Sequence, residues 1–183
     1  GGETGLGTYY AEQNRESIPI SEMPEDIQNA VVAAENETFW TDKGIDPRGI
    51  LRAFVSNTTE GTTHGASTIT QQYVKILYLS SERTWERKIK EAIVSLKIQQ
   101  QMSKEQVLEG YLNTIYFGRG AYGIQAAAQA FFDKDATDLT LRESAALAAI
   151  LNNPSTFDPR GGKEHVDLLR GRYEYVLNQM AEM

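Results

Sequence analysis

Apolar side chains recur every three to four residues through most of this chain, and that spacing constrains the fold more than any other feature. The stretch that begins at Pro24 places Ile27, Val31 and Ala34 on one face, which is the pattern of an amphipathic helix opened by proline. Further helices are expected on the same grounds within residues 47–55, 69–77, 85–96, 107–111, 140–151 and 170–183. The sequence therefore predicts a mainly α fold.

Polar capping residues mark where several of these helices begin. Ser103 with Gln106 and Thr140 with Glu143 have the spacing of capping boxes, in which side chains satisfy the first free backbone N–H groups. Thr84 is predicted to cap a helix. The residues predicted to form the core stripe of that helix are Trp85, Ile89, Ala92, Ile93 and Leu96.

Strand and loop signals are few. Thr8–Ala11 and Ser17–Ile20 are predicted to pair as a short ribbon near the N-terminus. Thr58–Gly65 is polar and contains glycine, so it is predicted to be a mobile loop. No internal linker separates two independent domains, and the whole chain, residues 1–183, is expected to be a single domain.

Composition excludes several classes of function. The net charge of -7 argues against a general nucleic-acid-binding protein, which normally carries a basic face. The absence of cysteine excludes disulfides and thiolate chemistry, and two distant histidines make a zinc site improbable. The chain contains neither a secretory signal nor a run of roughly 20 apolar residues. Its ends, Gly1 and Met183, suggest a fragment of a longer protein whose membrane anchor and further domains are missing.

The segment AAENETFWTDKG, residues 33–44, contains the first candidate for chemistry. Glu35 closes an apolar helix just before Phe39 and Trp40. A carboxyl group in such a partly dry environment has a raised pKa, which suits a general base. The alternative is a solvated helix end, which is the usual environment of glutamate.

The segment GASTITQQYVK, residues 65–75, contains small residues and hydroxyls at a predicted helix start. Backbone N–H groups there can bind an anion, and the side-chain amides of Gln71 and Gln72 suit sugar hydroxyls. An ordinary capped helix is the alternative.

The segment RTWERKIKE, residues 83–91, is the densest basic cluster of an acidic chain. Arg87 and Lys88 lie four and three residues before Glu91, so the three share one helix face. A surface ladder of ion pairs is one interpretation. A cationic clamp for phosphates with a carboxylate inside it is the other.

The segment NTIYFGRGAYG, residues 113–123, contains three glycines that permit turns and close approach of a ligand. A nucleotide-binding loop of this kind normally follows a strand, and no strand clearly precedes this segment. A corner between two helices is the simpler interpretation.

In this order, the four segments resemble the peptidoglycan glycosyltransferase domains of bifunctional penicillin-binding proteins and monofunctional transglycosylases. Those domains carry E-D-x-x-F-x-x-H-x-G, then G-[AG]-S-T-I-T-Q-Q, R-K-x-x-E and L-N-x-x-Y-F-G-x-G-x-x-G. A fifth motif, A-A-L-A-A-x-x-x-x-P-x-x-F-[DN]-P, is matched by Ala145–Pro159. The resemblance extends from about Ile18 to the C-terminus. The departures are Asn36, where the family usually has aspartate, and Asp42, where it often has histidine.

The resemblance implies a lysozyme-like fold with a larger lobe, a smaller membrane-facing lobe and a cleft between them. It implies that Glu35 removes a proton from the acceptor sugar of lipid II, which then attacks a lipid-linked glycan strand with inversion. It also implies a location at the extracytoplasmic face of a bacterial membrane, with cell-wall synthesis proteins as candidate partners. Glu91 is expected to order the cations or to hold a divalent metal such as Mg or Mn. The other residues expected to contact substrate are Phe39, Ser67, Thr68, Gln71, Gln72, Lys75, Arg87, Lys88, Asn113, Tyr116, Gly118 and Gly120.

Two other classes of function stay open on the sequence. A lysozyme-like hydrolase also uses a glutamate in a cleft but has no need of the Arg87–Lys88 cluster, and a glycan-binding module would need neither glutamate. For the transferase we expect Glu35 and Glu91 to face one cleft, at least the roughly 6.5–9.5 Å apart that inverting glycosidases show. We also expect Lys75, Arg87 and Lys88 to lie nearer Glu91 than Glu35.

Overall fold

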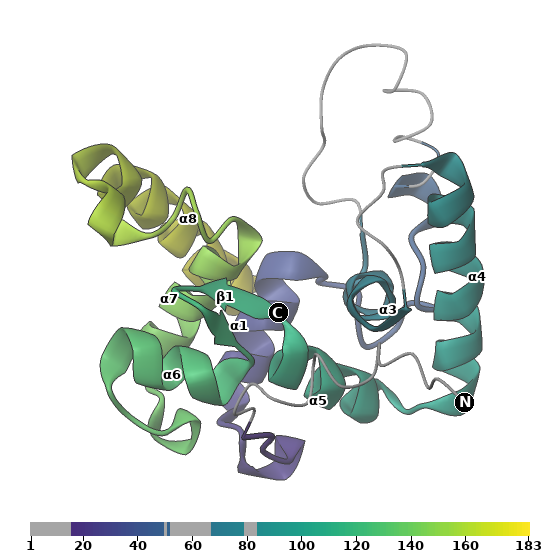
Figure 1. Ribbon diagram of the computed structural model, residues 1–183, viewed down its shortest axis with the longest axis horizontal. Coiled ribbons are helices and arrows are strands. Elements are labelled where there is room, and N and C mark those ends of the chain that lie inside the picture. Colours follow the sequence, from purple (N-terminus) through teal and green to yellow (C-terminus); the bar gives the residue numbers. More distant parts are fainter. Residues whose placement is uncertain (1–15, 50, 52–66, 79–83) are drawn as a thin grey trace, which may run out of the picture.

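The structure is a computed structural model that describes residues 16–49, 51, 67–78 and 84–183 (Figure 1). The predictions for Thr8–Ala11 and for the Thr58–Gly65 loop lie outside the described residues. Residues 47–49 are helical and directly follow Asp46, as the Asp-Pro pair predicts.

Helices dominate the described residues. The α-helices are α1 (Glu25–Glu35), α3 (Ile69–Tyr78), α4 (Trp85–Gln101), α5 (Lys104–Thr114), α6 (Ile124–Phe132), α7 (Leu141–Asn152) and α8 (Lys163–Glu182). Short 3₁₀ turns occur at Ile20–Glu22, Ala136–Asp138 and Pro159–Gly161, and the hairpin strands are β1 (Tyr116–Gly118) and β2 (Ala121–Tyr122). The mainly α class is therefore confirmed.

The predicted caps hold the helix ends. Thr84 accepts a hydrogen bond from the backbone N–H of Arg87 at the start of α4. Both predicted capping boxes are present, at the starts of α5 and α7. The last helix, α8, begins at Lys163, earlier than the residue 170 that the apolar spacing predicted.

The helices form two groups (Figure 1). In one, α1, α7 and α8 pack together with α6 and the hairpin alongside; in the other, α3 packs on α4. Helix α5 contacts both α3 and α6, so it joins the two groups. Its approach to α3 needs glycine, because a Cβ atom on Gly110 would lie 2.3 Å from the hydroxyl of Tyr73.

The N-terminal ribbon prediction is wrong for Ser17–Ile20, which forms no strand. The backbone N–H and C=O of Ile18 bond to the side-chain amide of Asn113 at 3.1 and 2.9 Å, and the N–H of Ile20 donates to Glu109 at 2.8 Å. Side chains of α5 thus take the hydrogen bonds that a second strand would have offered.

The hairpin was missed, because its glycines were interpreted as a corner between helices. Strands β1 and β2 pair antiparallel, with Tyr116 opposite Tyr122. Gly118 has a φ of 91°, and a Cβ atom there would lie 3.0 Å from the Cβ atom of Pro154. The turn and the close contact with the end of α7 therefore both require glycine.

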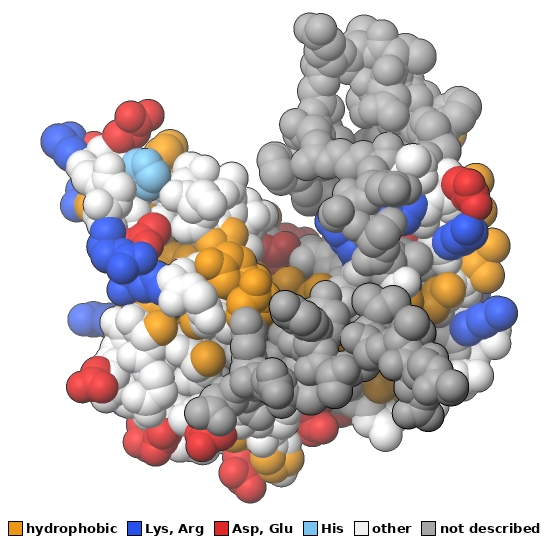
Figure 2. Space-filling view, in the orientation of Figure 1, with side chains coloured by type: hydrophobic (Ala, Val, Ile, Leu, Met, Phe, Trp, Pro, Cys, Tyr) orange, Lys and Arg blue, Asp and Glu red, His pale blue; other side chains and the backbone are white. Residues whose placement is uncertain are grey.

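The predicted core stripe of α4 is also wrong. Ile89, Ile93 and Leu96 are 58%, 50% and 38% exposed, and Figure 2 shows apolar side chains along the outer edge of α4 among charged ones. The face that packs on α3 instead buries Glu91 and Ser95. A polar face can be buried in this way because the Glu91 charge is paired, as described below.

Candidate active site

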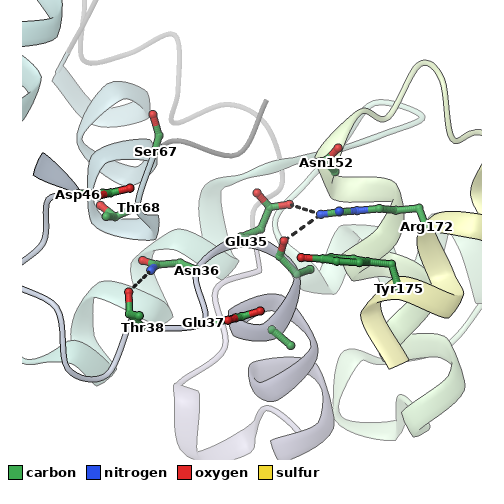
Figure 3. A pocket seen from close by; sticks show the side chains of 12 residues that line it. Glu35, Asn36, Glu37, Thr38, Asp46, Ser67, Thr68, Asn152, Arg172 and Tyr175 are labelled. Atoms are coloured by element: carbon green, nitrogen blue, oxygen red, sulfur yellow. Dashed lines mark hydrogen bonds and ion pairs between the residues drawn. The ribbon is translucent and has the colours of Figure 1, made fainter. Parts of the chain in front are cut away.

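A cavity of about 580 Å³ lies where the end of α1, the start of α3 and the α7–α8 region meet (Figure 3). The surface is hollowed between the two helix groups, with acidic side chains at its floor and basic ones on the side of α3 and α4 (Figure 2). The cavity is lined by Ala33, Ala34, Glu35, Asn36, Glu37, Thr38, Asp46, Ser67, Thr68, Asn152, Arg172 and Tyr175. Three of the predicted site residues, Glu35, Ser67 and Thr68, therefore share one cavity.

Glu35 is the last residue of α1, and its side chain is 8% exposed. Its Oε2 accepts a hydrogen bond from Nε2 of Gln72 at 3.3 Å. The oxygen of the same amide accepts from the hydroxyl of Tyr111 at 2.8 Å. Burial, with a smaller effect from the Glu35 charge, raises the pKa of Tyr111 well above its usual value, so the phenol stays a donor. This chain of hydrogen bonds from α5 through α3 fixes one oxygen of the carboxyl group.

The other oxygen of Glu35, Oε1, makes no hydrogen bond within the described part of the chain. Its nearest charged neighbour is Nη2 of Arg172, at 4.0 Å. Burial raises the pKa of Glu35 above its ordinary value, and the hydrogen bond from Gln72, the charge of Arg172 and the amide of Asn152 partly oppose this rise. A buried carboxylate with one uncommitted oxygen and a raised pKa has the properties of a general base.

The two departures from the family pattern have structural partners. Oδ1 of Asn36 accepts from the backbone N–H of Ile69 at 3.1 Å and Nδ2 donates to Thr38 at 3.2 Å, so the residue after Glu35 links α1 to the start of α3. Asp42 pairs with Lys104 at 2.8 Å and accepts from the backbone N–H of Gly44 at 2.7 Å. Asn36 therefore belongs to the cavity, while Asp42 stabilises the turn beyond it.

The Ser67–Thr68 segment is held by its own side chains. The hydroxyl of Thr68 donates to the backbone oxygen of Gly44 at 2.8 Å and accepts from the N–H of Gln71 at 3.1 Å. The side-chain oxygen of Gln71 accepts from the N–H of Thr68 at 2.9 Å, and Gln71 is fully buried. The oxygen of the Gln71 amide therefore folds the turn that presents Ser67, and contact of Gln71 with a ligand stays a prediction.

Glu91 lies behind Ser67 and is 2% exposed. Its carboxylate accepts from Nζ of Lys88 at 2.6 Å and from Nη1 of Arg87 at 2.9 Å. The same Nζ of Lys88 donates to the hydroxyl of Ser67 at 3.0 Å, at the wall of the cavity. Arg87 and Lys88 thus pair with Glu91, as predicted, and the cluster reaches the cavity through Ser67.

Several other predicted contacts have different roles. Phe39 is fully buried, beneath Lys104 at 4.6 Å and against Trp40, so its ring packs in the core, and its contact with substrate stays a prediction. Asn113 uses its amide to hold Ile18. The remaining predicted residues lie away from the cavity lining: Lys75, exposed on α3, and Tyr116, Gly118 and Gly120 in the hairpin and its turn.

The surroundings of Glu91 do not fit a divalent metal. Both carboxylate oxygens are already bonded to cations. The described residues include no group of three or more His, Asp or Glu side chains that could hold a metal ion. A metal there stays a prediction, and no step below depends on it.

Sequence reasoning missed the wall that α7 and α8 form. Asn152 ends α7, and Arg172 and Tyr175 extend from α8 toward Glu35 (Figure 3). Arg172 and Tyr175 lie more than a hundred residues from Glu35, in a helix rich in charged residues, where no spacing distinguishes a cavity residue from a solvated one. In the described part of the chain, no helix has the length and apolar character needed to cross a membrane.

Comparison with known proteins shows which family the chain belongs to. The family described as Transglycosylase matches residues 3–181. The chain is similar to penicillin-binding protein 1A of Neisseria lactamica, with 47% identity over 94% of this chain and 21% of the relative. It is also similar to penicillin-binding protein 1A of Mycobacterium tuberculosis, with 43% identity over 93% of this chain and 21% of the relative. The chain thus spans about a fifth of the length of these relatives. With nearly every residue inside the family match, the chain belongs to the transglycosylase family.

Proposed function

We propose that the chain is a peptidoglycan glycosyltransferase that polymerises lipid II into β-1,4-linked glycan strands. The observation that carries the proposal is Glu35, a buried carboxylate with one oxygen held by Gln72 and the other uncommitted, in a cavity whose opposite wall is reached by a paired cation cluster. Family membership and the names of the relatives support it.

In this function Glu35 acts on the acceptor. Oε1 takes the proton from the 4-hydroxyl of the acceptor sugar, and the oxygen of this hydroxyl attacks the anomeric carbon of the donor strand. The raised pKa makes Glu35 a stronger base than an ordinary glutamate and brings its pKa closer to the working pH, where a general base is most effective. Attack opposite the leaving group inverts the anomeric carbon.

The cation cluster acts on the donor. As the new C–O bond forms, the bond from the anomeric carbon to the pyrophosphate oxygen breaks, and undecaprenyl pyrophosphate leaves with the electron pair. Pyrophosphate needs charge stabilisation more than protonation. Lys88 and Arg87 are held by Glu91 with their side chains still 21% and 15% exposed, so they are fixed in place and remain accessible.

The cluster also favours a transferase over a hydrolase. A lysozyme-like hydrolase expels a sugar hydroxyl and needs a proton donor for it. Here the second buried carboxylate, Glu91, accepts hydrogen bonds from two cations and faces Ser67 only through Lys88. It is therefore not placed as a general acid, and the arrangement suits an anionic leaving group.

The outer face of α4 supports contact with a membrane surface. Ile89, Ile93 and Leu96 are exposed at the spacing of one helix face, beside exposed Lys90 and Lys97. Apolar side chains flanked by lysines suit an interface with anionic lipids. A lipid-linked substrate would then enter from the same side. The extracytoplasmic location and partners among cell-wall synthesis proteins remain proposals that follow from this function.

Incubation of the purified chain with fluorescent lipid II, in detergent or vesicles, tests the function. Glycan strands that lysozyme degrades are the expected product. A parallel incubation with polymeric peptidoglycan tests for hydrolysis. Release of soluble fragments from the polymer without polymerisation of lipid II would identify a hydrolase, and tight binding without turnover of either would identify a binding module.

A further inference from the structure

The C-terminal helix α8 reaches Glu35 independently of Gln72, which reaches it from α3. Nη2 of Arg172 donates to the backbone oxygen of Ala34 at 2.8 Å and lies 4.0 Å from Oε1 of Glu35. The guanidinium lies over the ring of Tyr175, 4.6 Å from its centroid. Figure 3 shows both side chains extending from α8 to the end of α1.

We propose that Arg172 is a positioning residue for Glu35: it fixes the last turn of α1 and places a positive charge beside the carboxyl group without occupying its free oxygen. Tyr175 keeps the guanidinium in that position. This inference rests on the proposed function, because it takes Glu35 as the base.

The contact with Ala34 is the structural half of this role. Carbonyl groups in the last turn of a helix lack partners within the helix, and cations are favourable there. Arg172 supplies both the hydrogen bond and the charge at the end of α1. The backbone just before Glu35 is thereby held from α8, while its side chain is held from α3 by Gln72.

The distance of 4.0 Å between Nη2 of Arg172 and Oε1 of Glu35 accounts for the electrostatic part of this role. A bidentate arginine–carboxylate pair would bond both oxygens and make the group a weak base. Here the bond to Ala34 and the contact with Tyr175 restrain the guanidinium. Its charge therefore favours the ionised carboxylate, and Oε1 stays able to accept a proton.

The other titratable groups around the cavity do not supply this charge. Glu37 and Asp46 line it and are acidic, and Tyr175 lines it as a phenol. Tyr111 faces Glu35 from α5, through Gln72. Among the described residues that line the cavity, Arg172 is the single cation, so its removal cannot be compensated by a neighbour there.

The test compares Arg172→Gln with Arg170→Gln, an exposed arginine on the same helix whose loss changes the net charge equally. Lipid II polymerisation is measured as kcat/KM across pH. For Arg172→Gln we expect the acid limb of the profile to move to higher pH, with roughly tenfold lower kcat/KM on that limb and recovery as pH rises, because an opposite charge at this range shifts a carboxyl titration by about one unit or more. Arg170→Gln should keep the wild-type profile. A loss for Arg172→Gln that is uniform at all pH values would overturn the proposal.

Tyr175 gives a second pair of variants in case Arg172→Gln folds poorly. Tyr175→Phe retains the ring and should leave the acid limb of the pH profile at its wild-type position, whereas Tyr175→Leu should move that limb in the same direction as Arg172→Gln, by less. Equal profiles for Phe and Leu would show that the ring does not restrain the guanidinium.

A readout without turnover separates this inference from the proposed function. Carbon-13 NMR of labelled glutamate carboxyls follows Glu35 directly, with its signal assigned by its loss in Glu35→Gln. Glu35 should titrate at higher pH in Arg172→Gln than in the wild type. An unchanged titration overturns the inference even if lipid II is polymerised. A shifted titration in a protein that never polymerises lipid II supports the Arg172–Glu35 coupling and rejects the function.

Discussion

Glu35 and Glu91 are both buried carboxylates, yet their partners are opposite in kind. Glu91 accepts from two cations at 2.9 and 2.6 Å. Glu35 accepts from the neutral amide of Gln72, and the guanidinium of Arg172 stops 4.0 Å away. Burial alone therefore does not identify a base. The number of lone pairs already committed distinguishes the carboxylate that can accept a proton from the one that holds cations.

The helices that carry the two glutamates also differ in which side chains they bury. Helix α1 buries its apolar side chains, with Ile27 and Val31 fully inaccessible, and within it only Glu25 is exposed. Helix α4 buries Glu91 and turns Ile89 and Ile93 outward. Pairing the charge of Glu91 makes it possible to bury the polar face of α4. It also leaves the apolar face available for the membrane contact proposed above.

The largest expected effect is on catalysis at Glu35. Glu35→Gln keeps the shape of the side chain and the contact with Gln72 but cannot take up the proton. We expect the rate of lipid II polymerisation to fall by about 10²–10⁴-fold, the usual cost of removing a general base. Glu37→Gln is the matched control, because Glu37 is exposed at the same cavity. If the two variants lose activity equally, or if Glu35→Gln stays within a few-fold of the wild type, Glu35 is not the base.

The next effect is on stability at Glu91. Glu91→Gln leaves Lys88 and Arg87 without a counter-charge in a partly buried cluster. We expect a loss of roughly 1–3 kcal/mol in the free energy of unfolding, because a charged group loses its partner. Urea denaturation measures it, with Glu86→Gln as the control, since Glu86 pairs with Lys90 at the exposed surface of the same helix. Equal losses for the two variants would mean that Glu91 stabilises the fold no more than an exposed ion pair does.

Sequence patterns predicted the elements whose signals are local. Capping boxes at Ser103 and Thr140 placed two helix starts correctly, because a cap depends on residues three positions apart. The outward face of α4 could not be predicted in this way. Apolar spacing shows that a helix has two faces, but not which of them packs on a neighbour, and the packed face here depends on ion pairs with Glu91.

The residues of the site also differ in whether a local sequence pattern predicts them. The motifs brought Glu35, Ser67 and the Arg87–Lys88 cluster together, because they carry recognisable residue types at short spacing. Phe39 belongs to a motif but packs in the core. A motif alone does not show whether a residue in it packs or binds substrate. Arg172 was missed because its partner, the carbonyl of Ala34, is a backbone group with no signature in the sequence.

A smaller effect concerns the departure at Asn36. Asn36→Asp restores the usual family residue; its oxygen can still accept from Ile69, but the amide that donates to Thr38 is lost. A second negative charge beside Glu35 disfavours ionisation of the base. We expect the acid limb of the pH–rate profile to move to higher pH, with a few-fold lower kcat/KM below neutral pH. Asn29→Asp in α1, away from this cavity, is the control, and an identical profile for both variants would mean that Asn36 does not influence the base.

The smallest effect is a gain of stability where activity is lost. The folded protein raises the pKa of Glu35, chiefly by burial, so the native state binds its proton more tightly than the unfolded chain does. Stability from this group is therefore full below the unfolded pKa and declines as pH rises through the folded one. Glu35→Gln removes the charge, so at neutral pH its Tm should exceed that of the wild type by a few degrees, and the difference should shrink toward pH 4. Calorimetry of both proteins across this range measures it, and Glu91→Gln should show a lower Tm than the wild type at neutral pH. If Glu35→Gln proved less stable at neutral pH, Glu35 would be a paired structural carboxylate like Glu91, and the contrast between the two would fail.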